Sequence, residues 1–288
     1  MKNSKAPSGA FFLPIFILML AMCSIQFGAS QAKHLFPILG VGGTSTLRLL
    51  FAGIMMTAVF RPWKIKFTHG VLKSLLFYGL SLGLMNYSFY FALERIPLGI
   101  AVALEFTGPL AVAIWSSHKK VDYLWALLAA VGIILLLPLE ITDHALDPLG
   151  ILFALIAGLC WALYIIFGKK AGDTLSGGVA SSMGMLVAAA AVLPFGIMAD
   201  GSKLFNLSAL PLALMVAFFG SALPYTLEMF ALKKMPTKTF GVLMSMEPAI
   251  ASLMGLLFLA ERLTTFQWLA IVCVIISSLG SSLTQRNK

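Results

Sequence analysis

The sequence contains very little charge. Only 11% of its 288 residues are Asp, Glu, Lys or Arg, whereas an average soluble domain carries about 25%. Hydrophobic residues make up 60% of the chain, and the mean hydropathy is +0.96. No stretch is polar enough to form a separate soluble domain, so the composition indicates a polytopic membrane protein.

Cysteine and histidine are also scarce, with three and four residues respectively. The cysteines at positions 23, 160 and 273 are odd in number and lie in apolar stretches, so their spacing predicts no disulfide framework. The histidines fall between the apolar runs, where they do not form a metal-ligand cluster. We therefore expect neither a metal site nor a cofactor.

The usual motifs of ATP-driven and hydrolytic proteins are missing. The sequence has no P-loop and no H-E-x-x-H. The segment from Gly79 to Gly83 matches G-x-S-x-G, but that motif needs a strand-to-helix turn and a histidine. In an apolar run it fits better as GxxxG, which lets helices pack closely. We expect no enzyme; an intramembrane enzyme is a remote alternative, and the lack of a soluble domain disfavours a receptor or scaffold.

Long apolar runs fill the rest of the chain. A bilayer core of about 30 Å needs roughly 20 apolar residues in a helix. By this measure the sequence predicts an all-α membrane protein with ten spans, at 11–32, 40–60, 71–93, 97–117, 121–139, 148–168, 177–198, 208–232, 238–259 and 264–284. The first run has about 22 residues, longer than the 7–15 of a signal peptide, so we interpret it as a retained span.

The basic residues are distributed unevenly between the two sides of these spans. In a soluble chain the net charge of +9 would suggest nucleic acid, but Lys and Arg also gather in the cytoplasmic loops of membrane proteins. Fifteen of the twenty lie on the side of the N-terminus, and one lies within a span. The other four, on the opposite side, are Lys33, Arg95, Lys203 and Arg262. We predict that both termini are cytoplasmic and that nucleic acid is not a partner.

The two halves of the chain resemble each other at an offset of 139 residues. The segment Tyr90–Ala111 aligns with Met229–Ile250. The matched positions are Phe91, Ala92, Leu93, Pro97 and Pro109 with Phe230, Ala231, Leu232, Pro236 and Pro248. The offset covers five spans, an odd number, so the second copy is inverted. We predict two inverted five-helix repeats, residues 1–145 and 146–288, an arrangement typical of secondary transporters with a substrate site between the repeats.

Two repeated prolines lie near mid-membrane and are candidate helix breaks. Pro109 and Pro248 should free the carbonyls four residues earlier, at Glu105 and Met244. Irregular backbone at that depth is tolerated where protein or a watery cavity satisfies it. The alternative is a kink that only improves packing.

Four ionisable residues lie well within spans: Arg48, Glu105, Glu228 and Glu247. Such groups usually face a cavity or one another. Counted from the paired prolines, Glu105 and Glu247 differ by three positions, about 300° of helix rotation, and should face the same way. Glu105 could instead pair with Arg48, Glu247 could brace the helix around Pro248, and Glu228 could bind a helix end. Arg48 is either a fixed counter-ion or a ligand for a substrate carboxylate.

Polar and aromatic side chains accompany these charges. Each is more often a packing residue or an interfacial anchor than a ligand. Asn86 is a stronger candidate because an amide in mid-span needs a partner, and the repeat offset pairs it with Tyr225. The full set is Gln26, Asn86, Tyr87, Tyr90, Trp161, Tyr164 and Tyr225.

Longer strings carry a family resemblance over nearly the whole chain. They are "RLLFAG" from Arg48, "MNYSFYFALERIPLGIAVALEFTGPLAVA" from Met85 and "LPYTLEMFALKKMPTKTFGVLMSMEP" from Leu223. The chain resembles the EamA-type branch of the drug/metabolite transporter superfamily, and within it the bacterial inner-membrane exporters of threonine and homoserine. The resemblance implies export of small neutral hydroxylated amino acids without ATP. Other branches move aromatic amino acids, purines or other metabolites, and fold does not fix substrate.

Together these features predict a transporter whose repeats rock around a central site. We expect the substrate ammonium to meet Glu105, its carboxylate Arg48 or a helix end, and its hydroxyl Asn86 or a tyrosine. Transport is proton-coupled if a buried carboxylate exchanges a proton for substrate, and facilitative otherwise. The expected partners are a small molecule and the lipid bilayer, and the oligomeric state stays open.

Overall fold

A computed structural model describes residues 9–65, 68–115, 120–136, 146–172, 174–235, 240 and 243–284. Over these residues the chain is almost entirely helical and has no strand, which confirms the predicted all-α class. The α-helices are α1 (Gly9–Phe60), α2 (His69–Arg95), α3 (Leu98–Glu105), α4 (Thr107–Trp115), α5 (Val121–Leu136), α6 (Pro148–Gly172), α7 (Gly177–Asp200), α8 (Leu210–Ala217), α9 (Leu223–Lys234), α11 (Glu247–Leu259) and α12 (Thr265–Thr284). A π-helix, η4 (Phe218–Ala222), joins α8 to α9, and the 3-10 helices are η1 (Pro62–Lys64), η2 (Gly201–Phe205) and η3 (Leu207–Ala209). Parts of the expected spans 97–117, 121–139 and 238–259, together with Pro236, lie outside the described residues.

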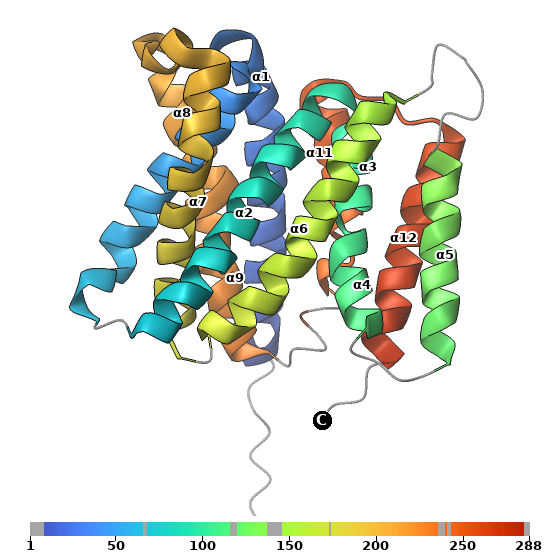
Figure 1. Cartoon of the computed structure of the whole chain (residues 1–288). Coiled ribbons are helices and arrows are strands. Elements are labelled where there is room, and N and C mark those ends of the chain that lie inside the picture. Colours follow the sequence, from blue (N-terminus) through green and yellow to red (C-terminus); the bar gives the residue numbers. More distant parts are fainter. Residues whose placement is uncertain are drawn as a thin grey trace, which may run out of the picture.

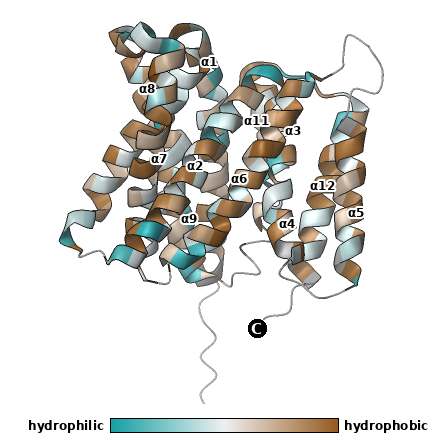
Figure 2. Ribbon diagram, viewed as in Figure 1, coloured by the Kyte–Doolittle hydropathy of each residue, from teal (hydrophilic) through white to brown (hydrophobic). Residues whose placement is uncertain are grey.

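Several helices are long and apolar enough to cross a membrane. Among the described residues, four stretches meet this criterion by length and composition: Phe12–Phe60, Pro148–Gly172, Gly177–Phe205 and Leu207–Lys234. Shorter apolar helices cover Leu98–Val112, Tyr123–Leu135, Glu247–Leu259 and Thr265–Ser281. Hydrophobic residues follow the lengths of the helices, whereas hydrophilic residues gather mostly toward the two ends of the bundle (Figure 2).

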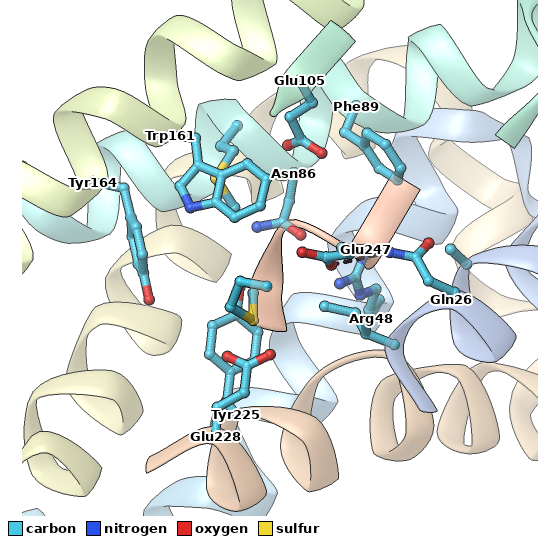
Figure 3. A pocket seen from close by; sticks show the side chains of 14 residues that line it. Gln26, Arg48, Asn86, Phe89, Glu105, Trp161, Tyr164, Tyr225, Glu228 and Glu247 are labelled. Carbon is cyan, nitrogen blue, oxygen red and sulfur yellow. Dashed lines mark hydrogen bonds between the residues drawn. The ribbon is translucent and has the colours of Figure 1, made fainter. Parts of the chain in front are cut away.

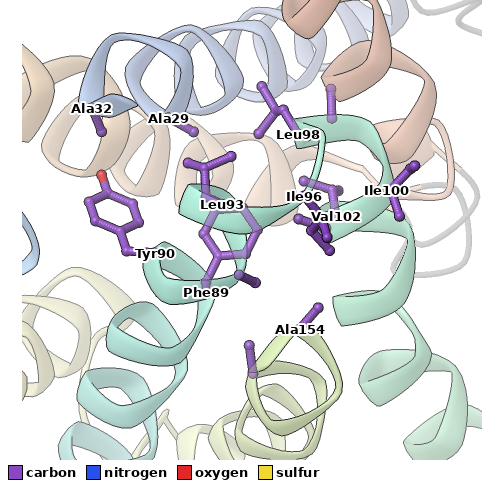
Figure 4. Packing of buried hydrophobic residues seen from close by; sticks show 14 of the residues in the cluster. Ala29, Ala32, Phe89, Tyr90, Leu93, Ile96, Leu98, Ile100, Val102 and Ala154 are labelled. Atoms are coloured by element: carbon purple, nitrogen blue, oxygen red, sulfur yellow. The ribbon is translucent and has the colours of Figure 1, made fainter. Parts of the chain in front are cut away.

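The helices pack in three groups (Figure 1). α2 and α6 cross side by side in the centre, α1 packs with α7, α8 and α9 on one flank, and α5 packs against α12 at the opposite edge. α1 begins and α12 ends at the same end of the bundle, the lower end in Figure 1. The central cluster joins α1, α2, α3 and α6 through side chains such as Ala29, Tyr90, Leu93, Leu98 and Ala154 (Figure 4). Small residues at these crossings let the helix backbones approach one another.

α1 changes direction at Gly40, where the backbone has φ 72° and ψ 169°. Such a positive φ is accessible mainly to glycine. The Asp200 carboxylate lies where a Cβ on Gly40 would point, and it accepts a hydrogen bond of 2.9 Å from the Gly43 N–H. The sequence predicts the break between the first two spans at residues 33–39, but the helix continues to Gly40. Apolar run length therefore placed this helix end too early.

The fourth expected span is broken near its proline. α3 ends at Glu105, α4 begins at Thr107, and the Thr107 hydroxyl donates to the Leu104 carbonyl over 2.6 Å. Pro109 thereby falls in the first turn of α4, and Pro248 falls in the first turn of α11. In a first turn the missing N–H of proline breaks no helical hydrogen bond. Each proline therefore starts a helix segment instead of interrupting one.

Ion pairs hold the upper end of the bundle together. Lys33 of α1 contacts Glu261 over 2.7 Å, and the other oxygen of Glu261 accepts the Leu98 N–H at the start of α3 over 2.8 Å. Arg95 at the end of α2 contacts Asp147 over 3.1 Å, beside the first turn of α6. Backbone N–H groups at the start of α6, followed by Arg95, hold the pKa of Asp147 below its usual value. These contacts join five segments at one end of the protein.

Candidate functional site

A cavity lies among α1, α2, α3, α6, α9 and the start of α11 (Figure 3). The space in which the centre of a water molecule fits has a volume of about 80 Å³. One water needs about 10–15 Å³ on this measure, so the cavity has room for a small solute. The lining residues are Ile25, Gln26, Ala29, Arg48, Met85, Asn86, Phe89, Glu105, Trp161, Tyr164, Tyr225, Glu228, Met244 and Glu247.

The cavity brings together most of the site residues that the sequence predicts. Nine of them line it, namely Gln26, Arg48, Asn86, Glu105, Trp161, Tyr164, Tyr225, Glu228 and Glu247. The other two tyrosines lie elsewhere. Tyr87 packs between Phe91 and Phe195, with ring centroids 4.9 and 6.0 Å away. Tyr90 is fully buried beside the cavity, where the Arg48 guanidinium lies 5.0 Å from the centre of its ring.

The three carboxylates come from different helix positions. Glu105 is the last residue of α3, Glu247 is the first residue of α11, and Glu228 lies inside α9. Within the described residues, the side chains of Glu105 and Glu228 make neither a hydrogen bond nor an ion pair. Glu247 has one partner, because Oε1 accepts a hydrogen bond of 3.0 Å from Gln26 Nε2. The cavity therefore presents acceptor oxygens without enough protein donors to pair them.

Arg48 binds the π-helix η4. Its Nε donates to the Ser221 hydroxyl and its Nη2 to the Gly220 carbonyl, both over 2.8 Å. Among the described residues Arg48 has no ion pair, so the alternative of a permanent pair with Glu105 does not occur in this structure. The side chain is buried and two of its three nitrogens are already bonded. Arg48 therefore fixes part of the cavity wall.

Proline explains why η4 needs this partner. Pro224 has no N–H to donate to the carbonyls of Phe219 and Gly220, which precede it by five and four residues. Both carbonyls are bonded from α1 instead: Ser24 Oγ donates to Phe219 over 2.7 Å, and Arg48 donates to Gly220. A Cβ on Gly28 of α1 would overlap the Gly220 backbone, so this crossing requires glycine. The two halves of α1 thus stabilise the irregular turn in front of α9.

The remaining polar lining residues are partly engaged. Asn86 donates Nδ2 to the Leu82 carbonyl over 2.8 Å, which leaves Oδ1 as its acceptor. Tyr164 stacks on Tyr78 at 4.8 Å, and their hydroxyls lie 3.3 Å apart. Trp161 makes an edge contact with Phe106, the residue between α3 and α4, at 5.4 Å. In the described part of the chain, no group of three His, Cys, Asp or Glu side chains could hold a metal ion.

Some functional positions were not predictable from the sequence. Met85, Phe89 and Met244 line the cavity, but they resemble any other apolar residue in a span. The π-helix did have a signal, since Pro224 follows Gly220 by four residues and marks a carbonyl that needs another donor.

Comparison with known proteins identifies the family. The model of the EamA-like transporter family matches residues 148–283, from the start of α6 to the end of α12. The chain is 50% identical over 277 residues to the threonine/homoserine exporter RhtA of Escherichia coli (strain K12), covering 96% of this chain and 94% of that one. The chain belongs to the EamA-like transporter family. The predicted family is confirmed.

Two more distant relatives agree with the EamA-like assignment. The uncharacterized inner membrane transporter YedA of Escherichia coli (strain K12) is 26% identical over 290 residues, covering 94% of this chain and 92% of that one. A solved crystal structure of a protein superposes with a TM-score of 0.60 and 17% identity, covering 96% of this chain and 99% of the other. That likeness concerns the fold alone. The relatives named as exporters and transporters support the prediction that this EamA-like protein is not an enzyme.

Proposed function

We propose that this protein exports small neutral amino acids across the bacterial inner membrane, with threonine and homoserine as its substrates. The observation that carries the proposal is the 50% identity to RhtA over 96% of the chain. An identity of this size over nearly the whole of both chains favours a shared activity. The inner-membrane location is supported by YedA, which is named an inner membrane transporter, and by the long apolar helices.

The cavity chemistry supports a small zwitterion. Acceptor oxygens of Glu105, Glu228 and Glu247 suit an ammonium group, and amide or phenol groups of Asn86 and Tyr225 suit a hydroxyl. The cavity has room for several waters, which is enough for a small amino acid. The second candidate function is export of aromatic amino acids or related metabolites. The observation that favours it is the aromatic wall that Trp161, Tyr164 and other rings provide.

The same proposal includes ten spans in two inverted five-helix repeats, residues 1–145 and 146–288, with both termini in the cytoplasm. Three features support it. The kink at Gly40 divides α1 into two spans, and α3 with α4, like α8 with α9, forms one interrupted span. α1 begins and α12 ends at the same end of the bundle (Figure 1). Pro109 and Pro248, related by the 139-residue offset, both fall in first turns of helices.

Alternating access and proton coupling complete the mechanism that we propose. Rocking of the repeats would open the cavity to each side in turn. Glu105 is the proposed proton carrier, since its buried carboxylate borders the cavity and has no partner among the described residues. Glu105→Gln should abolish transport or its pH dependence while expression stays normal. The check is efflux at a series of pH values, and wild-type pH-dependent export in this variant would contradict the role.

Excretion from cells tests the substrate. In a strain that overproduces threonine and homoserine, expression of this chain should raise both amino acids in the medium, measured by mass spectrometry, and leave phenylalanine unchanged. A suitable control is Ala29→Met, which fills the cavity from α1 and should return excretion to the level of the empty vector. Unchanged threonine with raised phenylalanine would favour the second candidate function.

A further inference from the structure

We infer that Gln26 and Glu247 form the subsite for the primary ammonium group of the substrate. The inference rests on the proposed function and assigns one group of the substrate to two side chains of the cavity. It replaces the sequence-based expectation that Glu105 receives the ammonium.

The first observation is how the two side chains are held. Gln26 of α1 donates Nε2 to Glu247 Oε1 over 3.0 Å, and the two residues are only 3% and 4% exposed. This bond fixes the amide so that its nitrogen points to Glu247 and its carbonyl oxygen does not. Figure 3 shows the two side chains next to each other, with the Gln26 amide nitrogen directed at the Glu247 carboxylate.

The second observation is what remains unpaired. Glu247 Oε2 and Gln26 Oε1 are buried, and neither has a hydrogen-bond partner among the described residues. Leaving a buried acceptor unsatisfied is costly, and a ligand with several N–H donors is suited to satisfy both oxygens. A primary ammonium carries three N–H donors and no acceptor. A carboxylate offers only acceptors, and a hydroxyl has a single donor and no charge to match Glu247.

Charge separates the acids of the cavity, Glu247 among them, from the acids at the upper end of the bundle. At the upper end of the bundle, Glu261, Asp147 and Asp200 each have a basic side chain within 4.0 Å. Glu247 has none in the described part of the chain, because the guanidinium of Arg48 is bonded to η4. A buried carboxylate without a cation is costly. A cationic group on the ligand supplies the positive charge that the described part of the protein does not place beside Glu247.

Helix ends distinguish Glu247 from Glu105. The N-terminus of a helix carries partial positive charge and stabilises a carboxylate, while the C-terminus carries partial negative charge and destabilises one. Glu247 is the first residue of the 13-residue helix α11, whereas Glu105 is the last residue of α3. The fold thus favours a negative charge on Glu247, where an ammonium can bind, over one on Glu105. Glu247 can then bind the substrate ammonium while Glu105 exchanges the proton.

The test is a binding experiment on the purified full-length protein with paired ligands. L-Threonine is compared with 2,3-dihydroxybutyrate, which keeps the carboxylate and the hydroxyl but has no ammonium, by competition against labelled threonine. In the wild type threonine should bind at least about tenfold more tightly, as expected for a charge-assisted hydrogen bond. In Glu247→Gln and Gln26→Leu this ratio should fall toward one.

Glu94→Gln is the control, since it removes a partly exposed carboxylate that does not line the cavity and should keep the wild-type ratio. The inference is overturned if Glu247→Gln weakens both ligands equally, or if the ratio falls in Glu105→Gln and not in Glu247→Gln. Size-exclusion profiles in detergent verify that each variant is folded.

A second measurement needs no variant. N-Trimethylthreonine keeps the positive charge but has no N–H donor. Its failure to compete with threonine for the wild-type protein supports the subsite, and competition equal to threonine overturns it. If the wild type binds neither threonine nor homoserine, the proposed substrates are wrong. Propylammonium and propionate then replace the ligand pair, and their protection of the purified protein against thermal unfolding is measured. Protection of the wild type but not of Glu247→Gln by propylammonium supports the subsite. Equal protection of both proteins by propylammonium overturns it.

Discussion

Gly108→Val is expected to prevent accumulation of folded protein. A Cβ on Gly108 of α4 would overlap the backbone carbonyl of Gly158 on α6. From the other side, a Cβ on Gly158 would lie 2.8 Å from the carbonyl of Glu105, which Pro109 leaves without its helical donor. Neither obstacle is a side chain that can turn away. Overpacking costs typically about 1–3 kcal/mol where neighbours can shift, and a larger loss follows where they are backbone.

Fluorescence-detected size exclusion of the detergent-solubilised protein measures this outcome. The wild type should give one symmetric peak, and Gly108→Val should give aggregate or no peak. Gly172→Val is the control, because Gly172 ends α6, the helix that α4 crosses, and a Cβ there meets nothing within 4 Å. A Gly108→Val variant with a wild-type peak and melting temperature would contradict the close crossing of α4 and α6.

Arg48→Ala is expected to abolish transport because it removes the donor that η4 requires. The change leaves the Gly220 carbonyl and the Ser221 hydroxyl buried without the guanidinium. Each unsatisfied buried group costs about 1–3 kcal/mol. The expected result is a clear loss of melting temperature together with loss of threonine exchange. Arg48→Lys should restore little of the melting temperature or the threonine exchange, since a single ammonium cannot reproduce the two directed bonds of the guanidinium.

A double variant separates this positioning role from substrate binding. Pro224→Ala provides an N–H that can reach the carbonyl of Gly220 within its own helix. If Arg48 supports η4, adding Pro224→Ala to Arg48→Ala should recover part of the lost melting temperature. If Arg48 is instead only a ligand for the substrate carboxylate, the two changes should be additive in stability. Additivity would contradict our assignment of Arg48 to the cavity wall.

Much of the site could be predicted because membrane physics makes charged residues conspicuous. Arg48, Glu105, Glu228 and Glu247 stand out in apolar runs, and all four line one cavity. The helical class and the transporter family followed from apolar run length and from long matching strings. Helix rotation counted from Pro109 and Pro248 predicts that Glu105 and Glu247 face the same way, and both line the cavity.

The rest depends on contacts between segments far apart in the sequence. α1 kinks at Gly40, where the carboxylate of Asp200 from α7 packs, and apolar run length has no information about that contact. The bonding of Arg48 depends on η4, 172 residues away in the sequence. Phe89 lines the cavity and Tyr90 does not, although both are aromatic residues of one helix turn.

The central claim is that this cavity serves threonine and homoserine, and counterflow tests it most directly. Proteoliposomes containing the purified protein are preloaded with unlabelled threonine, and uptake of labelled threonine is followed with homoserine or phenylalanine as competitor. The account predicts uptake that homoserine blocks and phenylalanine does not. Absence of threonine counterflow together with clear exchange of phenylalanine would contradict it.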